Sequence, residues 1–266
     1  MITRYYGVVF FAALMLFNSG FASAGENVDY THKDLQLEGY WSASECKTAS
    51  SDPLVLIVHQ WRGLGEYEKE RADMLAKECY NAFAIDMYGK GVRPENNKAA
   101  SKESAKYKNN PELARDRLQA ALNYARKRIN DDKRQAAIMG YCFGGTMALE
   151  LARSGANINA AVSFHGGLST KKPANNSAGT INASIQVHHG AEDPYVPEGE
   201  VKAFIDEMDA AEADWFLIKY ADAVHSFTEK AAGNDPSKGV AYNAKADKRS
   251  WATTLVFLDQ VFGSKQ

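Results

Sequence analysis

Short apolar runs alternate with longer amphipathic segments along most of the chain. The wholly apolar run Leu54–Val58 is typical of a strand that is buried on both faces. The charged segment Glu66–Tyr80 that follows it has the pattern of a surface helix. An early strand or hairpin is expected at Leu35–Ser42. The same patterns predict further strands at Ala82–Ile85, Gln135–Met139, Ala160–Phe164, Ile185–His188 and Trp215–Tyr220. They predict further helices at Pro111–Ile129, Thr146–Arg153, Glu198–Ala211 and Tyr242–Phe262.

This alternation predicts an α/β fold, with a mostly parallel central sheet and helices on both of its faces. Residues 89–111 are polar and rich in Gly, Asn, Lys and Ser, which predicts a long excursion or lid. No repeat and no Pro/Ser-rich linker divides the chain, so we expect one domain over residues 25–266. In an open parallel sheet, functional groups gather beyond the carboxyl ends of the strands, so reactive residues just after a strand carry extra weight.

Residues 1–24 have the features of an export signal. Arg4 gives a positive start, Tyr5–Phe17 is apolar, and Ala22-Ser23-Ala24 is a small-residue cleavage site. The alternative is a membrane anchor, but the apolar run is short for a bilayer span and Asn18-Ser19-Gly20 interrupts it. We therefore expect an exported protein, periplasmic or secreted, that is cleaved near Ala24 and has no membrane partner afterwards.

Composition and charge indicate which classes of partner the protein can bind. Of the 266 residues, 45% are hydrophobic and 24% are charged, which is an ordinary globular profile. The net charge is −2 and no Lys/Arg stripe is interleaved with aromatics, so we expect no nucleic-acid partner. Of the three cysteines, Cys46 and Cys79 either pair in an oxidising compartment or stay as buried thiols, and both readings remain open. The sequence does not indicate an oligomeric state.

The third cysteine lies in a glycine-rich turn between a strand and a helix. Gly140-Tyr141-Cys142-Phe143-Gly144 has the G-x-S-x-G pattern of a nucleophile elbow, with Cys in place of Ser. Such a turn projects the central side chain into a cleft and places it at a helix N-terminus, where a thiolate is stabilised. The pattern is short, and a buried structural cysteine is the alternative. We identify Cys142 as the candidate nucleophile.

A thiol nucleophile needs a base, and the base needs a group that orients it. Asp193 follows the strand Ile185–His188, and His225 follows the strand Trp215–Tyr220. The chain order of nucleophile, acid and histidine is that of α/β hydrolases. Glu192 is the rival to Asp193 as the acid.

The other histidines have alternative roles. His59 and His165 also follow strands, so either is placed to line the cleft, whereas His32 lies in the polar start of the chain. His188 and His189, next to acidic residues, allow a metal cluster, but spaced ligand patterns are missing, so we expect no metal and no cofactor.

These motifs together resemble the dienelactone hydrolase family of α/β hydrolases. The similarity runs from about Leu54 to Phe262 and includes Gly190-Ala-Glu-Asp-Pro-Tyr-Val-Pro197 and His225-Ser-Phe227. The resemblance implies a Cys142–His225–Asp193 triad and favours Asp193 over Glu192. It also implies an oxyanion hole made by the backbone N–H groups of Trp61 and Phe143.

Two substrate-pocket candidates depart from the family pattern. Members of the family carry a glutamate before the residue that matches Trp61, and it helps to ionise the thiol; this chain has Gln60. They also carry an arginine four residues after the catalytic histidine that holds a substrate carboxylate; this chain has Glu229. We therefore expect neutral substrates to be preferred over anionic lactones.

The leading hypothesis is a hydrolase that cleaves ester or lactone bonds of a small molecule through a thioester on Cys142. Loss of the family glutamate at Gln60 motivates the alternative, a non-catalytic binding protein on a hydrolase scaffold. A redox thiol protein is a third reading, but the chain lacks a C-x-x-C pair.

Overall fold

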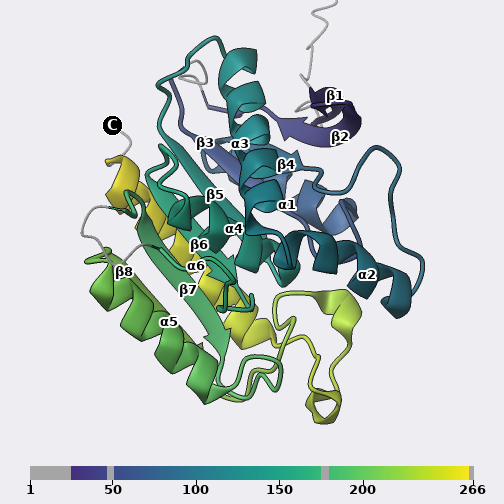
Figure 1. The fold of residues 1–266 in the computed structure, drawn as a ribbon, viewed down its shortest axis with the longest axis vertical. Helices are drawn as coiled ribbons and strands as arrows, with labels where there is room; N and C mark the ends of the chain where they lie inside the picture. The colour runs from purple at the N-terminus through teal and green to yellow at the C-terminus, as the bar shows by residue number, and fades with distance from the viewer. Residues whose placement is uncertain (1–24, 47–50, 175–179, 264–266) are drawn as a thin grey trace, which may run out of the picture.

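The computed structural model describes residues 25–46, 51–174 and 180–263, and these contain one eight-stranded sheet (Figure 1). The strand order is β1-β2-β4-β3-β5-β6-β7-β8. The hairpin β1–β2 and the pair β2–β4 are antiparallel, and all the other neighbours are parallel. The strands are β1 (Glu26–His32), β2 (Leu35–Ser42), β3 (Leu54–Val58), β4 (Asn81–Ile85), β5 (Ala136–Tyr141), β6 (Ala160–Phe164), β7 (Ser184–Gly190) and β8 (Trp215–Tyr220). The predicted fold class is therefore confirmed.

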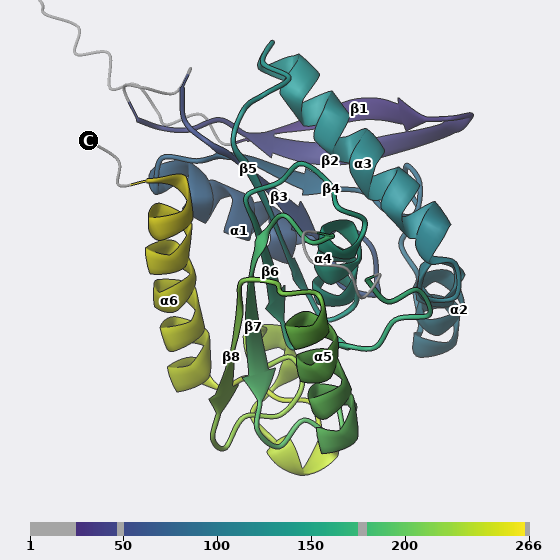
Figure 2. The same ribbon diagram turned by 60° about the vertical axis from the view of Figure 1, so that its left-hand side comes forward.

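Helices cover both faces of this sheet (Figure 2). One face carries α1 (Glu66–Lys77) and α6 (Ala244–Phe262). The other carries α3 (Pro111–Arg128), α4 (Phe143–Arg153) and α5 (Glu198–Ala210), and α2 (Asn97–Lys108) packs beside α3. Two short 3-10 turns, Lys230–Ala232 and Pro236–Lys238, lie between β8 and α6.

The central strands are apolar throughout because both of their faces are covered. In β3, Leu54, Leu56 and Val58 pack into the core on the α3–α4 side. Val55 and Ile57, which alternate with them, pack into the core under α1 and α6. Successive side chains of a strand point to opposite faces, so a strand between two helical layers needs apolar residues at every position.

Two local predictions differ from the structure. The polar start of the chain forms β1, whose last residue His32 accepts a hydrogen bond from Arg117 at 2.7 Å. Residues 89–111, predicted as a long excursion or lid, contain the helix α2: its N-cap Asn96 accepts from the Ala99 N–H, and Tyr107 of this helix is buried. Helix α2 is polar because most of its surface faces solvent. Its few apolar residues give no clear helical periodicity, so the sequence pattern did not predict it.

A disulfide joins Cys46, which follows β2, to Cys79, which lies between α1 and β4, and their Cα atoms are 5.3 Å apart. Cys142 is the free cysteine of the chain. The expected export signal lies outside the described residues. Within the described ranges, no helix is long and apolar enough to cross a bilayer.

Candidate active site

The carboxyl ends of three parallel strands bring Cys142, Asp193 and His225 together. Cys142 follows β5, Asp193 lies in the loop after β7, and His225 lies in the loop after β8. The Nε2 atom of His225 is 3.1 Å from the Sγ atom of Cys142. Its Nδ1 atom is 2.8 Å from the Oδ2 atom of Asp193. The geometry is that of a nucleophile, a base and an orienting acid.

The turn at Cys142 is strained, and glycines permit it. Cys142 is the N-cap of α4 and has φ 54° and ψ −116°. A side chain at Gly140 would collide with the backbone of Gly144, and one at Gly144 would collide with the backbone of Val58. The turn therefore requires glycine at both positions, and it leaves the sulfur beyond the sheet at the start of a helix.

The loop that carries Asp193 fixes the orientation of its carboxylate. The Asp193 side chain is completely buried, and its Oδ1 atom accepts a hydrogen bond from the Tyr195 N–H at 2.9 Å. Its other oxygen is thereby directed to His225. Glu192, the rival acid, is exposed, so the structure places Asp193 and not Glu192 beside the imidazole.

A separate segment holds the backbone of His225. The His225 N–H donates to the carbonyl of Gly239, and the carbonyl of His225 accepts from the Ala241 N–H. His225 forms a bridge with Val240 between these bonds. The imidazole is therefore fixed from its main chain as well as from Asp193.

The electrostatics of the cluster favour a thiolate–imidazolium pair. Burial raises the pKa of the Cys142 thiol, but attraction to His225 outweighs it, with help from Lys108 and the Phe143 N–H, so the pKa lies below its ordinary value. Burial lowers the pKa of His225, but the sulfur of Cys142 and the carboxylate of Asp193 raise it above its ordinary value. Both shifts favour transfer of the thiol proton to the imidazole.

The two residues expected to supply oxyanion-hole donors, Phe143 and Trp61, both lie at this site. The Phe143 N–H is the first of α4, so no helical carbonyl accepts from it, and it is directed at Cys142. Trp61 lies in the turn after β3, and the Tyr88 hydroxyl donates to its carbonyl oxygen at 3.1 Å. The Phe143 N–H therefore has the placement of an oxyanion-hole donor, and Trp61 lines the same cavity.

Glu68, a residue that the sequence did not single out, accepts hydrogen bonds from the backbone of the loop that carries Trp61. Glu68 accepts hydrogen bonds from the N–H groups of Gln60 at 3.2 Å and Gly65 at 2.9 Å. Burial raises the pKa of the Glu68 carboxyl to about 7. The sequence feature that could have pointed to Glu68 is its position in the first turn of α1, where an acidic residue caps the helix.

A cavity of about 290 Å³ opens at Cys142 and His225. Aromatic and aliphatic side chains dominate its wall, together with one cation, Lys108. Its other lining residues are Trp61, Gly167, Tyr195, Val196, Ser226 and Val240. A space of this size suits a small molecule.

Neither Gln60 nor Glu229 lines this cavity. Gln60 is buried, with its N–H directed to Glu68. Glu229 is half-buried and lies close enough to Glu68 to raise the pKa of that carboxyl. The geometric basis for repulsion of an anionic substrate by Glu229 is therefore missing, because the chain turns away from the cavity after Ser226.

Of the other histidines, His165 contacts the nucleophile turn. Its Nδ1 atom accepts from the Cys142 N–H at 3.1 Å, and its Nε2 atom lies 2.8 Å from the Thr228 hydroxyl. His188 has both ring nitrogens occupied, by Tyr220 and by Thr254. In the part of the chain that the structure describes, no group of three or more His, Cys, Asp or Glu side chains is placed to hold a metal.

Comparisons with known proteins identify the family of the chain. The chain matches the dienelactone hydrolase family over residues 38–262. An uncharacterised protein of Caenorhabditis elegans is 43% identical over 148 residues, which are 55% of this chain and 92% of that protein. A Bradyrhizobium protein named "Probable 2-oxo-3-(5-oxofuran-2-ylidene)propanoate lactonase" is 27% identical over 213 residues, 77% of this chain and 83% of its own length.

A solved structure extends the similarity to three dimensions. A dienelactone hydrolase-like promiscuous phosphotriesterase from metagenomic libraries is 33% identical and superposes with a TM-score of 0.78, covering 89% of this chain and 98% of its own. The match of the family to most of the chain and the likeness of this structure agree. The protein is an α/β hydrolase that belongs to the dienelactone hydrolase family.

Proposed function

We propose that this hydrolase cleaves ester or lactone bonds of small molecules through a Cys142–His225–Asp193 triad and a thioester acyl-enzyme. Membership of the dienelactone hydrolase family implies hydrolysis of ester or lactone bonds. The observation that carries the finer proposal is the hydrogen-bonded series from Sγ of Cys142 through His225 to Oδ2 of Asp193, at 3.1 and 2.8 Å.

In the proposed first step, the Cys142 thiolate attacks the substrate carbonyl carbon. The electron pair of the C=O bond moves to oxygen, and the N–H groups of Trp61 and Phe143 stabilise the resulting oxyanion. Collapse of this intermediate breaks the C–O ester bond, and His225 gives its proton to the leaving oxygen. Asp193 keeps the Nδ1 proton of His225 in place, so Nε2 faces the reacting atoms throughout.

In the second step, neutral His225 takes a proton from water as that water attacks the thioester. The new tetrahedral intermediate uses the same two N–H donors, and its collapse releases the acid and the Cys142 thiolate. For a lactone, both products of ring opening are one molecule, a hydroxy acid.

The direct test is turnover of p-nitrophenyl acetate and butyrate by the purified protein. Cys142→Ala should abolish turnover, and the His225→Ala variant should lower it by about 10²–10⁴-fold. Mass spectrometry of the wild type, quenched during turnover, should find the acyl group on the peptide that contains Cys142. Unchanged turnover by Cys142→Ala would refute the proposal, whereas absence of turnover by the wild type would favour a binding protein on a hydrolase scaffold.

We also propose that the protein is exported. Residues 1–24 have the pattern of a cleaved signal. The Cys46–Cys79 disulfide supports this proposal, because such bonds persist in oxidising compartments. N-terminal sequencing of the protein recovered from a periplasmic or culture fraction should begin near Gly25; a chain retained in the cytoplasm with its leader would contradict it.

A further inference from the structure

Strand β8 forms the outer edge of the sheet at its parallel end (Figure 2). In the described ranges its only strand neighbour is β7. The carbonyls of Asp214 and Tyr220 accept hydrogen bonds from N–H groups of the β7 segment. Because the backbone groups of successive strand residues point to opposite sides, those of Trp215, Leu217 and Lys219 point away from the sheet.

This edge is apolar and lacks the features that usually block an exposed strand. Proline and free charges are common on protected edges. Strand β8 has no proline, and its one charged residue, Lys219, pairs with Glu198 at 2.6 Å. Phe216 on this strand is 37% exposed and Val256 on α6 is 57% exposed. The Phe216 ring lies 5.3 Å from that of Phe257, the neighbour of Val256, so strand and helix form one apolar strip.

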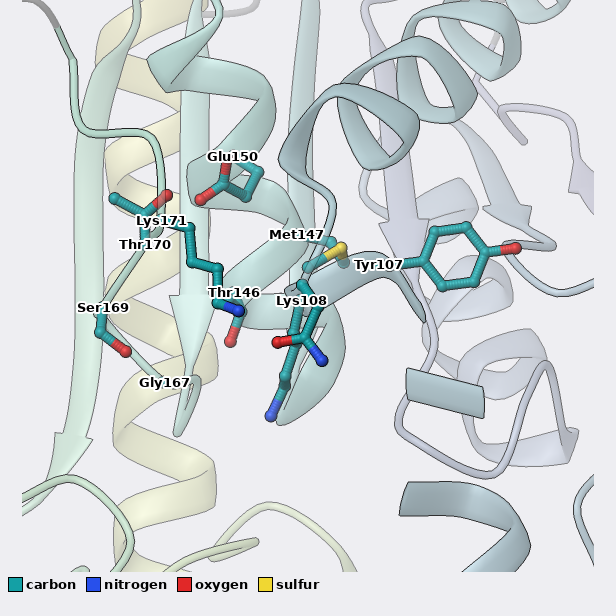
Figure 3. A pocket seen from close by; sticks show the side chains of 10 residues that line it. Tyr107, Lys108, Thr146, Met147, Glu150, Gly167, Ser169, Thr170 and Lys171 are labelled. Atoms are coloured by element: carbon teal, nitrogen blue, oxygen red, sulfur yellow. The ribbon is translucent and has the colours of Figure 1, made fainter. Parts of the chain in front are cut away.

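A groove of about 570 Å³ lies between β8 and α6. It shares no lining residue with the catalytic cavity, whereas the pocket drawn in Figure 3 shares Lys108 and Gly167 with that cavity. Tyr220 and Thr253 are among the residues that line the groove, and Val256 follows Thr253 by one helical turn. The groove and the apolar strip are therefore parts of one surface that is separate from the proposed catalytic centre.

The two ends of this surface carry opposite charge. At the start of β8, Asp214 is exposed, and the Asp209 carboxylate accepts from the Trp215 Nε1–H at 3.0 Å. At the other end, three cations and one acid line the groove: Lys219, Lys245, Arg249 and Asp222. Among the described residues, neither Asp209 nor Asp214 nor Arg249 has a side chain of opposite charge within ion-pair distance.

We propose that this surface is the interface of a two-fold dimer, in which β8 pairs antiparallel with β8 of a second copy of the chain. With the axis at Leu217, Trp215 lies opposite Lys219 of the second copy. All the outward-facing groups are then paired, in about six backbone hydrogen bonds. The two sheets become one, and no open edge remains on this side. The inference does not depend on the proposed function.

Charge complementarity selects a second copy as the occupant. Trp215 packs on the α5 side of the sheet, so Lys219 of one copy approaches the Trp215 ring and the Asp209 carboxylate of the other. On the α6 side, Asp214 lies opposite the end of the other β8, where Arg249 lines the groove. Because the axis relates the two ends of the strand, each of these contacts occurs twice.

The test is the mass of the purified protein in solution. Sedimentation equilibrium between about 1 and 100 µM should give twice the mass of one chain at the higher concentrations. Arg249→Glu and Asp214→Lys should each raise the dissociation constant of the dimer by about tenfold or more, and the two changes together should restore it. Lys248→Glu is the matched control, because Lys248 is exposed beside Arg249 but does not line the groove. If Asp214→Lys does not fold, Arg249→Glu and Val256→Lys carry the test.

Cysteine cross-linking in the Cys142→Ala background reads the register. Leu217→Cys puts a thiol on the axis, where the Cα atoms of opposite residues are about 5.5 Å apart, within the reach of a disulfide. Lys219→Cys, on the same strand and the same face, is the control, because its two copies are about 14 Å apart. Mild oxidation should link the Leu217→Cys chains and leave the Lys219→Cys chains single.

Three outcomes would overturn the inference. The first is a monomer over the whole concentration range, which would leave the edge of β8 to a strand of another protein. The second is a dimer that Arg249→Glu and Asp214→Lys do not weaken, because its interface then lies elsewhere. The third is equal linking of Leu217→Cys and Lys219→Cys. Ester turnover by the monomeric variants would leave the proposed function standing in each case.

Discussion

The backbone N–H of Cys142 lies 3.1 Å from the Nδ1 atom of His165, so a histidine outside the proposed triad holds the main chain of the proposed nucleophile. The same N–H also donates to the Phe164 carbonyl, at 3.0 Å. On the other side of the ring, Nε2 contacts Thr228, whose hydroxyl also accepts from Tyr67. Because Nδ1 accepts, the ring proton lies on Nε2 and points to Thr228.

Burial lowers the pKa of His165 well below its ordinary value, and repulsion by His225 lowers it further. His165 therefore stays neutral at neutral pH. A charge here would both cost the hydrogen bond to Cys142 and repel the imidazolium of His225, whose ring centroid is 5.2 Å away.

We predict that His165 is a positioning residue for the nucleophile. His165→Asn keeps an acceptor near the Nδ1 position, and His165→Gln keeps a donor near the Nε2 position. In His165→Gln, loss of the acceptor should lower kcat about tenfold with little change in KM. His165→Asn keeps the acceptor, so its kcat should lie between that of His165→Gln and that of the wild type. Because His165 does not titrate, the pH profile should keep its shape; equal losses in kcat and stability for both variants would indicate a purely structural role.

The thiol of Cys142 should react at a lower pH than an ordinary cysteine. Its lowered pKa means that, at a given pH, more of this thiol is ionised than of an ordinary cysteine. Alkylation by iodoacetamide, followed across pH 5–10, should therefore have its inflection at a lower pH than that of an ordinary cysteine, and His225→Ala should move the inflection upward. Coincident profiles for the two proteins would show that His225 does not lower the pKa of this thiol.

Asp193→Asn should lower kcat/KM for p-nitrophenyl esters by about 10²–10⁴-fold. The amide donates to Nδ1 instead of accepting from it, so the imidazole takes the tautomer that cannot receive the thiol proton. Glu192→Gln, at the exposed neighbour, is the matched control and should stay within about twofold of the wild type. A comparable loss in both variants would point to damage of the loop after β7.

The buried carboxyl of Glu68 should make stability depend on pH. Burial raises the pKa of this carboxyl to about 7 in the folded protein. In the unfolded chain the same carboxyl loses its proton at a lower pH, so between these two pH values the folded state binds one proton more. Its stabilising contribution is present below about pH 4 and is lost as pH rises through 7, by up to about 3 kcal/mol. Urea unfolding at pH 5 and pH 8 should show that Glu68→Gln gains stability relative to the wild type at the higher pH; parallel shifts of both proteins would contradict this.

Reduction of the Cys46–Cys79 disulfide should lower the stability of the protein but leave Cys142, Asp193 and His225 in place. Cys46 and Cys79 are 33 residues apart, and closing a loop of that length stabilises by about 3–4 kcal/mol. Dithiothreitol should lower Tm by about 10 °C, and the Cys46→Ala/Cys79→Ala variant should have a low Tm that no longer responds to it. Thiol titration of the denatured, unreduced protein should find Cys142 alone; more than one reactive thiol would refute the bond.

The sequence by itself determined the fold class, because a strand covered on both faces must be apolar throughout. Leu54–Val58 and Ala160–Phe164 were predicted with the bounds of β3 and β6. It also placed Cys142, Asp193 and His225 at strand ends, because the parallel order of the sheet brings such ends to one edge. Polar β1 and α2 were missed, because apolar periodicity is weak in elements that face solvent.

Tertiary structure alone decided what surrounds the sulfur. Gln60 and Glu229 were judged by their distance in sequence from Trp61 and His225, yet the Glu68 contact and the turn after Ser226 keep them out of the cavity. Lys108 carries no motif, and it enters the wall of the cavity because the C-terminal end of α2 lies near Cys142. A strand end fixes one residue in space, whereas the wall of a pocket depends on how several elements pack, which no local pattern records.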